Sequence, residues 1–224
     1  MENSRILLLH QNSVRSGAIP QEAFNWSRSK KNWKRDLFAH SDFISRLPTA
    51  LDRATLRELA TSSANSNVEK FIAIMIWGYG DVGYGSYRVN IMLNSIGFSE
   101  KIDQVSEYCR NGQPLKAYGY LTNNRIEKLG PEFGTKFISF LTPREIVAPI
   151  YDSFISKWMA LHAQEAFAGK SSSSLAWNLR TYSAYVQWME KQAAKLDCLG
   201  DDLELLIFRD ALQQFSNSSR WANL

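Results

Sequence analysis

The sequence has very few residues that could hold a metal ion or build a disulfide framework. Its 224 residues include two cysteines, Cys109 and Cys198, which lie far apart and form no C-x-x-C pair. This argues against a disulfide scaffold or a structural zinc site and excludes a four-cysteine iron-sulfur cluster. The histidines, His10, His40 and His162, are scattered. We therefore expect no metal and no other cofactor.

Long apolar segments are missing as well. The longest run, residues 71–77, is far shorter than the roughly 20 residues that cross a bilayer. The N-terminus has neither a strongly basic segment nor a small-residue cleavage site, so we expect no signal peptide and a cytoplasmic protein. The content of 45% hydrophobic and 21% charged residues is typical of a globular protein. The net charge of +4 permits affinity for a phosphate backbone but does not require it.

Helical periodicity dominates the sequence, which predicts an all-α fold of two helical lobes flanking a cleft. The only expected extended element is short, near Ile6 to Leu9. We expect one domain over residues 1–224, with a flexible serine-rich loop at 169–174 and C-terminal helices within 175–224. Helix caps are predicted at Asp52, Asn67, Ser86 and Ser99. Further helices are predicted at 114–121, 123–129, 135–141, 153–168, 175–196 and 201–215.

The segment from Ile126 to Trp158 carries the clearest functional pattern. A glycine-containing hairpin, residues 129–134, separates two short apolar-periodic segments, and Lys136 lies at the predicted start of the second. Asp152 comes sixteen positions later and opens a third predicted helix. The pattern is a helix-hairpin-helix, at about 123–141, followed by a candidate catalytic carboxylate.

This segment resembles the helix-hairpin-helix and catalytic aspartate of the 8-oxoguanine DNA glycosylase fold, a superfamily that excises bases from DNA. The resemblance places the family's Gly-Thr-Lys on residues 134–136. It places the family's apolar-Pro-apolar-x-Asp segment on Pro149, Ile150, Tyr151 and Asp152. The hairpin here is about one residue longer and contains Pro131 and Glu132. A looser likeness to a bacterial group of such proteins, some associated with anti-phage defence, lies in the aromatic, glycine-containing segment from Trp77 to Arg88.

The resemblance implies catalytic roles for Lys136 and Asp152. A carboxylate beneath C1′ stabilises the positive charge that develops on the sugar, and an amine can attack C1′ and form a Schiff base, with strand cleavage as a second activity. A helix start at Lys136 would favour its neutral form. Taken alone, an aspartate before a helix is usually an N-cap and a lysine on a short helix is usually solvated. The pairing with the hairpin favours the catalytic interpretation.

DNA contacts are expected at the hairpin and beside it. Backbone N–H groups of Phe133, Gly134 and Thr135 could bind a phosphate, and Arg125 and Lys128 lie beside them. The alternative is a plain helix-helix turn.

An aromatic, glycine-rich stretch precedes the hairpin. Gly78, Gly80 and Gly83 fit G-x-G-x-x-G, but the helical context argues against a dinucleotide site. We instead expect a tight loop whose side chains stack on a flipped base or fill the gap that it leaves, or else fill the core. These candidates are Trp77, Tyr79, Tyr84, Tyr87 and Arg88. The basic segment 26–35, with its interleaved tryptophans, either tracks a phosphate backbone or is a solvated face anchored by Trp26 and Trp33.

The leading hypothesis is a monomeric DNA glycosylase that flips a damaged or modified base out of double-stranded DNA and leaves an abasic site. The alternative is a non-catalytic protein of the same fold that serves a defence system and binds nucleic acid or a modified base on a partner protein. A third, weaker option is partner binding through Ile6 to Leu9.

Overall fold

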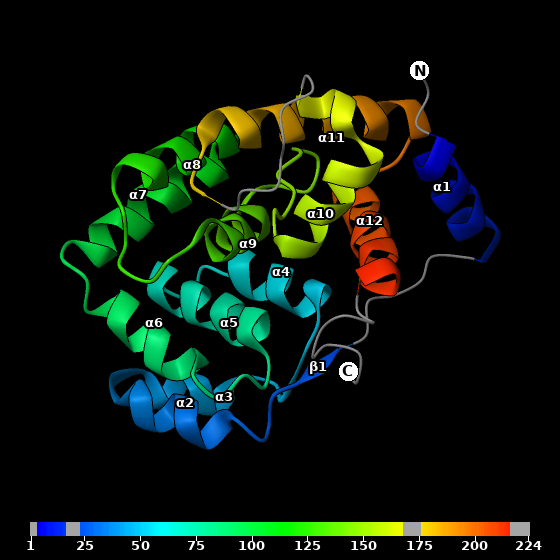
Figure 1. Cartoon of the computed structure of the whole chain (residues 1–224). Coiled ribbons are helices and arrows are strands. Elements are labelled where there is room, and N and C mark those ends of the chain that lie inside the picture. Colours follow the sequence, from blue (N-terminus) through cyan, green and yellow to red (C-terminus); the bar gives the residue numbers. More distant parts are fainter. Residues whose placement is uncertain (1–3, 17–22, 168–175, 216–224) are drawn as a thin grey trace. The chain divides into compact units, whose positions relative to one another are not determined.

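The computed structural model describes residues 4–16, 23–167 and 176–215 (Figure 1). These residues are mainly helical, and the strands among them form a two-stranded antiparallel ribbon, β1 (Phe24–Asn25) paired with β2 (Ala50–Leu51). The predicted all-α class is confirmed. The serine-rich loop predicted at 169–174 lies outside the described residues. No described helix is long and apolar enough to cross a membrane.

The chain divides into two compact units, which we describe separately. Unit 2 comprises residues 20–143, and unit 1 combines residues 1–19 with 144–224. Within unit 2, the helical elements after β1 are α2 (Lys30–Asp36), η1 (Phe38–His40), α3 (Ser41–Arg46), α4 (Arg53–Thr61), α5 (Asn67–Tyr79), α6 (Gly85–Leu93), α7 (Phe98–Arg110), α8 (Pro114–Asn123) and α9 (Pro131–Leu141).

Helix α5 forms the centre of unit 2. It packs against α4, α6, α7 and α9, and nearly all of its apolar side chains are buried. Phe71 of α5 meets Phe98 of α7 and Phe137 of α9 edge-on, with ring centres 5.1 and 5.2 Å apart. A helix that is apolar around most of its circumference must be covered on most sides, which explains this central position.

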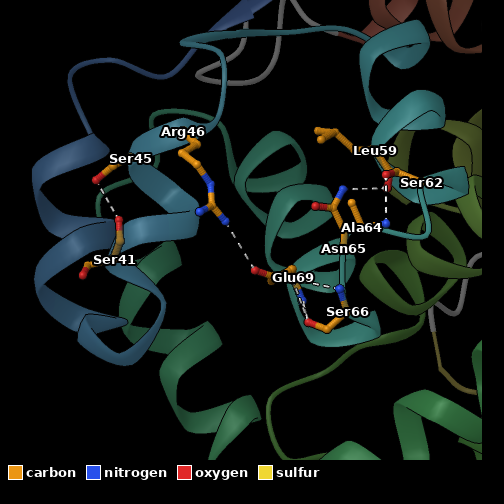
Figure 2. Close-up of polar contacts among 9 residues, drawn as sticks. All are labelled: Ser41, Ser45, Arg46, Leu59, Ser62, Ala64, Asn65, Ser66 and Glu69. Atoms are coloured by element: carbon orange, nitrogen blue, oxygen red, sulfur yellow. Dashed lines mark hydrogen bonds and ion pairs between the residues drawn. The ribbon is translucent and has the colours of Figure 1, made fainter.

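The start of α5 differs from the prediction in its cap. Ser66, rather than Asn67, accepts a hydrogen bond from the Glu69 backbone N–H, while the Glu69 carboxylate accepts from the Ser66 backbone N–H (Figure 2). This capping box satisfies two N–H groups at the helix start. Arg46 of α3 lies 4.0 Å from the other Glu69 carboxylate oxygen, so the same glutamate also faces α3.

Other helix starts were predicted with mixed success. Asp52 caps α4 through the Thr55 N–H, as expected. The caps predicted at Ser86 and Ser99 are wrong, because α6 and α7 begin at Gly85 and Phe98 without side-chain caps. The Ser86 hydroxyl instead donates to Asp36, 2.6 Å away.

The basic segment 26–35 is a solvated face anchored by tryptophans. Trp26 and Trp33 are buried, and the Trp26 indole N–H donates to the Pro48 carbonyl. Lys31 and Lys34 are exposed. The anchored-face interpretation is therefore confirmed for the two tryptophans.

Unit 1 consists of α1 (Ser4–Ser16), α10 (Ser153–His162), η2 (Gln164–Phe167), α11 (Leu179–Leu196) and α12 (Gly200–Phe215). Helix α1 lies beside α12, as Figure 1 shows, so segments from the two ends of the chain pack together. The extended element predicted at Ile6 to Leu9 is wrong: these residues are helical, and Ile6 is buried. That apolar residue therefore serves internal packing.

A buried carboxylate, Asp210 of α12, joins three parts of unit 1. It accepts hydrogen bonds from Arg5 of α1, from the Trp158 indole N–H of α10 at 2.7 Å, and from Gln214 at 2.6 Å. Burial acts to raise the pKa of Asp210, but these hydrogen bonds and the Arg5 charge outweigh it and hold the pKa below its ordinary value.

Candidate functional site

Helix α9 begins earlier than the sequence pattern indicated. Gly130 is its extended N-cap residue and Pro131 occupies the first helical position, where proline's fixed φ and missing N–H cost nothing. At the other end, the guanidinium of Arg57 donates to the Thr142 carbonyl at 2.6 Å. The helix predicted at 135–141 thus extends back to Pro131.

The connection before α9 is also different. Helix α8 ends at Asn123, so the helix predicted at 123–129 is wrong, and residues 124–130 form an irregular connection. Lys128 in this connection has φ +63°, a conformation that is uncommon for a residue with a side chain.

The longer helix changes the roles of the predicted phosphate donors. The Gly134 N–H donates to the Gly130 carbonyl at 2.9 Å, so it is engaged inside the helix and not directed at a phosphate. Thr135 is fully buried, and its hydroxyl donates to the Glu132 carbonyl. Among the three predicted donors, only Phe133 lies in the first turn, where backbone N–H groups have no helical partner.

Lys136 projects from the second turn of α9 and is buried, with 8% of its side chain exposed. Its amine lies 2.9 Å from the Glu132 Oε1 atom and 4.9 Å from the centre of the Phe133 ring. The expectation that Lys136 sits at a helix start is wrong, because α9 already begins at Pro131. The positive end of the helix dipole acts within the first turn, so it does not favour the neutral form of this amine. The solvated alternative is also wrong, since the amine is buried against a carboxylate and a ring.

Phe133 belongs to an aromatic group that we define as Trp33, Tyr79, Tyr84 and Phe133. Its ring stacks on Tyr79 with centres 4.1 Å apart and an interplanar angle of 20°. Tyr84 meets Tyr79 edge-on at 6.1 Å, and Trp33 lies 6.4 Å from Tyr79. Burial raises the pKa of the Tyr79 hydroxyl to about 12, because a phenolate would lose its hydration in this position.

Gly78 allows α9 to place these side chains against α5. A Cβ atom at this position would lie 2.9 Å from the Phe133 ring and 3.1 Å from Cδ of Lys136. Contacts this short force neighbouring atoms to shift. The glycine therefore provides the space in which the lysine arm lies.

Arg88 connects the aromatic group with the α8–α9 connection. Its guanidinium lies 5.9 Å from the centre of the Tyr84 ring and donates to the Lys128 carbonyl at 3.3 Å. Tyr84 and Tyr87 are 55% and 62% exposed. The predicted DNA-contact residues Arg125 and Lys128 are exposed as well.

Trp77 does not join this group. Helix α5 continues through Trp77 to Tyr79, so the predicted tight loop begins only at Gly80, where φ is +57°, and leads to α6 at Gly85. Trp77 instead packs edge-on against Phe140, with ring centres 5.2 Å apart. The element directly before Gly80 and Gly83 is helix α5 and not a strand, in line with the helical context on which the argument against a dinucleotide site was based.

Asp152 lies in unit 1 and caps α10. Its Oδ1 atom accepts from the backbone N–H groups of Phe154 and Ile155 at 3.0 and 2.9 Å, and the residue is 5% exposed. The hydroxyls of Tyr182 and Tyr185 on α11 donate to the carbonyls of residues 149 and 150, just before it. The N-cap interpretation of Asp152 is confirmed, and a cap can also be a catalyst.

Two features of this region were not predicted from the sequence. Glu132 stands four residues before Lys136, a spacing that places two side chains on the same helix face, and this was the available signal. The steric role of Gly78 has no comparable signal. Within the described ranges, no group of three or more His, Cys, Asp or Glu residues could hold a metal ion.

Comparison with known proteins supports the resemblance at the level of the family. Residues 17–208 match the model of the family described as "Putative 8-oxoguanine DNA glycosylase OGG-like protein". Searches of curated proteins and of solved structures gave no match. Because the family model covers most of the sequence, the chain belongs to the 8-oxoguanine DNA glycosylase OGG-like family.

Proposed function

We propose that this protein is a DNA glycosylase that excises a damaged or modified base from double-stranded DNA by base flipping and leaves an abasic site. The observation that carries the proposal is the buried amine of Lys136, in a Gly-Thr-Lys segment within the part of the chain that matches the family. A buried lysine is normally paired, and this amine has its partner in Glu132, which fixes its position. The fixed amine is the kind of group that nucleophilic excision requires.

The proposed chemistry assigns separate roles to the two predicted catalytic residues. The Lys136 amine attacks C1′ of the flipped nucleotide and displaces the base. The carboxylate of Asp152 stabilises the positive charge that develops on the sugar. The covalent intermediate rearranges to a Schiff base, from which the strand can be cleaved at the abasic site.

The exposed side chains of unit 2 supply the proposed DNA contacts. Tyr84 and Tyr87 present large aromatic surfaces, and Arg88 places positive charge next to Tyr84. Arg88 also donates to the backbone carbonyl of Lys128, whose side chain is exposed. Aromatic rings can stack on bases irrespective of sequence, and cations bind phosphates. A surface of this kind fits a protein that distorts a duplex in order to extract one nucleotide.

The test is single-turnover excision with enzyme in excess over DNA. A panel of duplexes carries oxidised, alkylated or hypermodified bases, including phage-type modified pyrimidines, and alkaline cleavage reveals abasic sites. We expect at least one duplex to yield abasic product with the wild type and none with Lys136→Gln. A panel without any product, from protein that is folded and binds DNA, would refute the proposal.

A non-catalytic role is the second candidate, and the contacts of the two residues favour it. Lys136 is paired with Glu132, and Asp152 caps a helix, so each has a structural task that needs no reaction. In this case the protein binds nucleic acid, or a modified base on a partner protein, in anti-phage defence. Binding to modified DNA that Asp152→Asn leaves unchanged, without turnover by the wild type, would support this candidate.

A further inference from the structure

Glu132 contacts the Lys136 amine but has no role in the reaction proposed above. It lies in the first turn of α9, its carboxylate is 2.9 Å from the Lys136 amine, and 34% of its side chain is exposed. Lys136 itself is nearly buried, with the Phe133 ring on another side of the amine. The Glu132 side chain is therefore partly open to solvent while its carboxylate contacts the buried amine.

An ordinary surface ion pair would not have these properties. Exposed pairs four residues apart on a helix hold two mobile side chains loosely and contribute little. Here the lysine arm is confined by the Phe133 ring and by α5, where Gly78 leaves room for its Cδ atom. With the arm confined, Glu132 determines where the Nζ atom points.

We propose that Glu132 positions the Lys136 amine and accepts its proton during nucleophilic attack. This inference rests on the proposed glycosylase function. A lysine attacks only as a neutral amine, so the ammonium must first lose a proton to a group within hydrogen-bond reach. Among the contacts of the described residues, the carboxylate at 2.9 Å meets this requirement.

The proton balance of the step is simple. The Lys136 ammonium transfers one proton to the Glu132 carboxylate, and the lone pair of the amine forms a bond to C1′ as the bond between C1′ and the base nitrogen breaks. The base leaves with that electron pair and takes up a proton from the Glu132 carboxylic acid. Glu132 returns to its ionised form, and no oxidant, reductant or co-reactant is consumed.

The experiment measures Schiff-base formation with a duplex that already contains an abasic site. Wild type, Glu132→Gln, Glu132→Asp and Lys136→Gln are mixed with this DNA in excess, and the adduct is trapped with borohydride at intervals over a series of pH values. Circular dichroism and DNA binding are measured for each variant, so that a misfolded protein is recognised. Glu132→Ala is tested with and without added acetate.

We expect Glu132→Gln to form the adduct about 100-fold more slowly than the wild type, the lower end of the range for general acid–base groups. The wild type and Glu132→Asp should share a pH profile of the rate, and Glu132→Gln should not follow it. Acetate should restore part of the rate of Glu132→Ala.

Two other outcomes separate the possible failures. If the wild type forms the adduct on Lys136 and Glu132→Gln forms it at the same rate with the same pH profile, Glu132 is a structural partner only and this inference is wrong, while the proposed function stands. If the wild type forms no adduct while it binds the DNA, nucleophilic chemistry at Lys136 fails, and the role of Glu132 fails with it.

Discussion

Asp152 is expected to be both a helix cap and a catalytic group, and two substitutions separate these roles. Asparagine keeps a side-chain oxygen that can accept from the Phe154 and Ile155 N–H groups, and it caps helices about as well as aspartate. Alanine has no acceptor, so these two donors lose their partner. The asparagine variant thus removes the charge and keeps the cap, whereas the alanine variant removes both.

The structure sets the size of the expected stability change. Loss of an N-cap costs about 0.5–2 kcal/mol, and a buried N–H without a partner costs about 1–3 kcal/mol. Because Asp152 and Ile155 are both buried, we expect Asp152→Ala to lose about 2 kcal/mol of unfolding free energy. For a chain of this size that lowers the unfolding midpoint by roughly 4–8 °C. Asp152→Asn should stay within about 1 °C of the wild type.

The activity of the same variants should follow a different order. Removing a group that stabilises charge in a transition state typically costs about 10²-fold or more in rate. We expect Asp152→Asn to lose at least that much in single-turnover excision while its DNA affinity and unfolding midpoint are preserved. The assays are differential scanning calorimetry, duplex binding and product formation on the best duplex of the panel.

Either of two results would refute this reasoning. Full excision by Asp152→Asn would leave the residue with its capping role alone. An unfolding midpoint of Asp152→Asn as low as that of Asp152→Ala would contradict the assignment of the cap.

Three further predictions concern packing, pH and thiol reactivity. Gly78→Ala should lower the rate of Lys136 adduct formation about tenfold or more, since a small displacement of a reacting group is costly. Gly83→Ala, where a Cβ meets nothing within 4 Å, should leave the rate unchanged. Equal rates in the two variants would contradict the role of Gly78 in making room for the lysine arm. Because the pKa of Asp210 is lowered in the folded protein, its carboxylate stabilises unit 1 above about pH 4, and that contribution is lost as the pH falls further. The thermal unfolding midpoint should therefore drop more steeply in acid for the wild type than for Asp210→Asn. Parallel curves for the two proteins would contradict this role of Asp210. Burial raises the pKa of Cys109 to about 12, so iodoacetamide should spare this thiol in the native protein and modify it after denaturation. Peptide mass spectrometry measures the modification, with the other cysteine as internal control. Rapid modification of Cys109 in the native protein would contradict its burial.

Local sequence patterns predicted the helical class and several helix ends. The first of the two long C-terminal helices was expected to end at residue 196, where α11 does end. Asp52 was predicted as a cap, and a cap was the alternative interpretation for Asp152, because an aspartate followed by an apolar-periodic segment is a strong local signal. Such signals depend on a few neighbouring residues and survive folding.

The errors arose where local signals compete. Pro131 was assigned to a hairpin because it follows a glycine, yet proline is equally suited to the first helical position, and the structure uses it there. With Pro131 inside the helix, Lys136 lies in the second turn of α9 and not at the helix start that was predicted. The extended element near Ile6 was expected from a local apolar patch. In the structure these residues are helical, and their helix packs on α12, which the local sequence does not reveal.

The surroundings of Lys136 depend on contacts between distant segments. Tyr79 and Phe133 are 54 positions apart and stack only because α5 and α9 pack together. No periodicity in one segment reveals which face of another it will meet. The residue types of the candidate site could thus be predicted, but the partners of each side chain could not.

The most direct test of the central claim is to identify the amine that becomes bonded to DNA during base excision. A reacting duplex is trapped with borohydride, the protein is digested, and the modified peptide is sequenced by mass spectrometry. We predict one adduct, on Lys136, and loss of both adduct and excision in Lys136→Gln. An adduct on another amine, or excision that Lys136→Gln leaves intact, would contradict the claim.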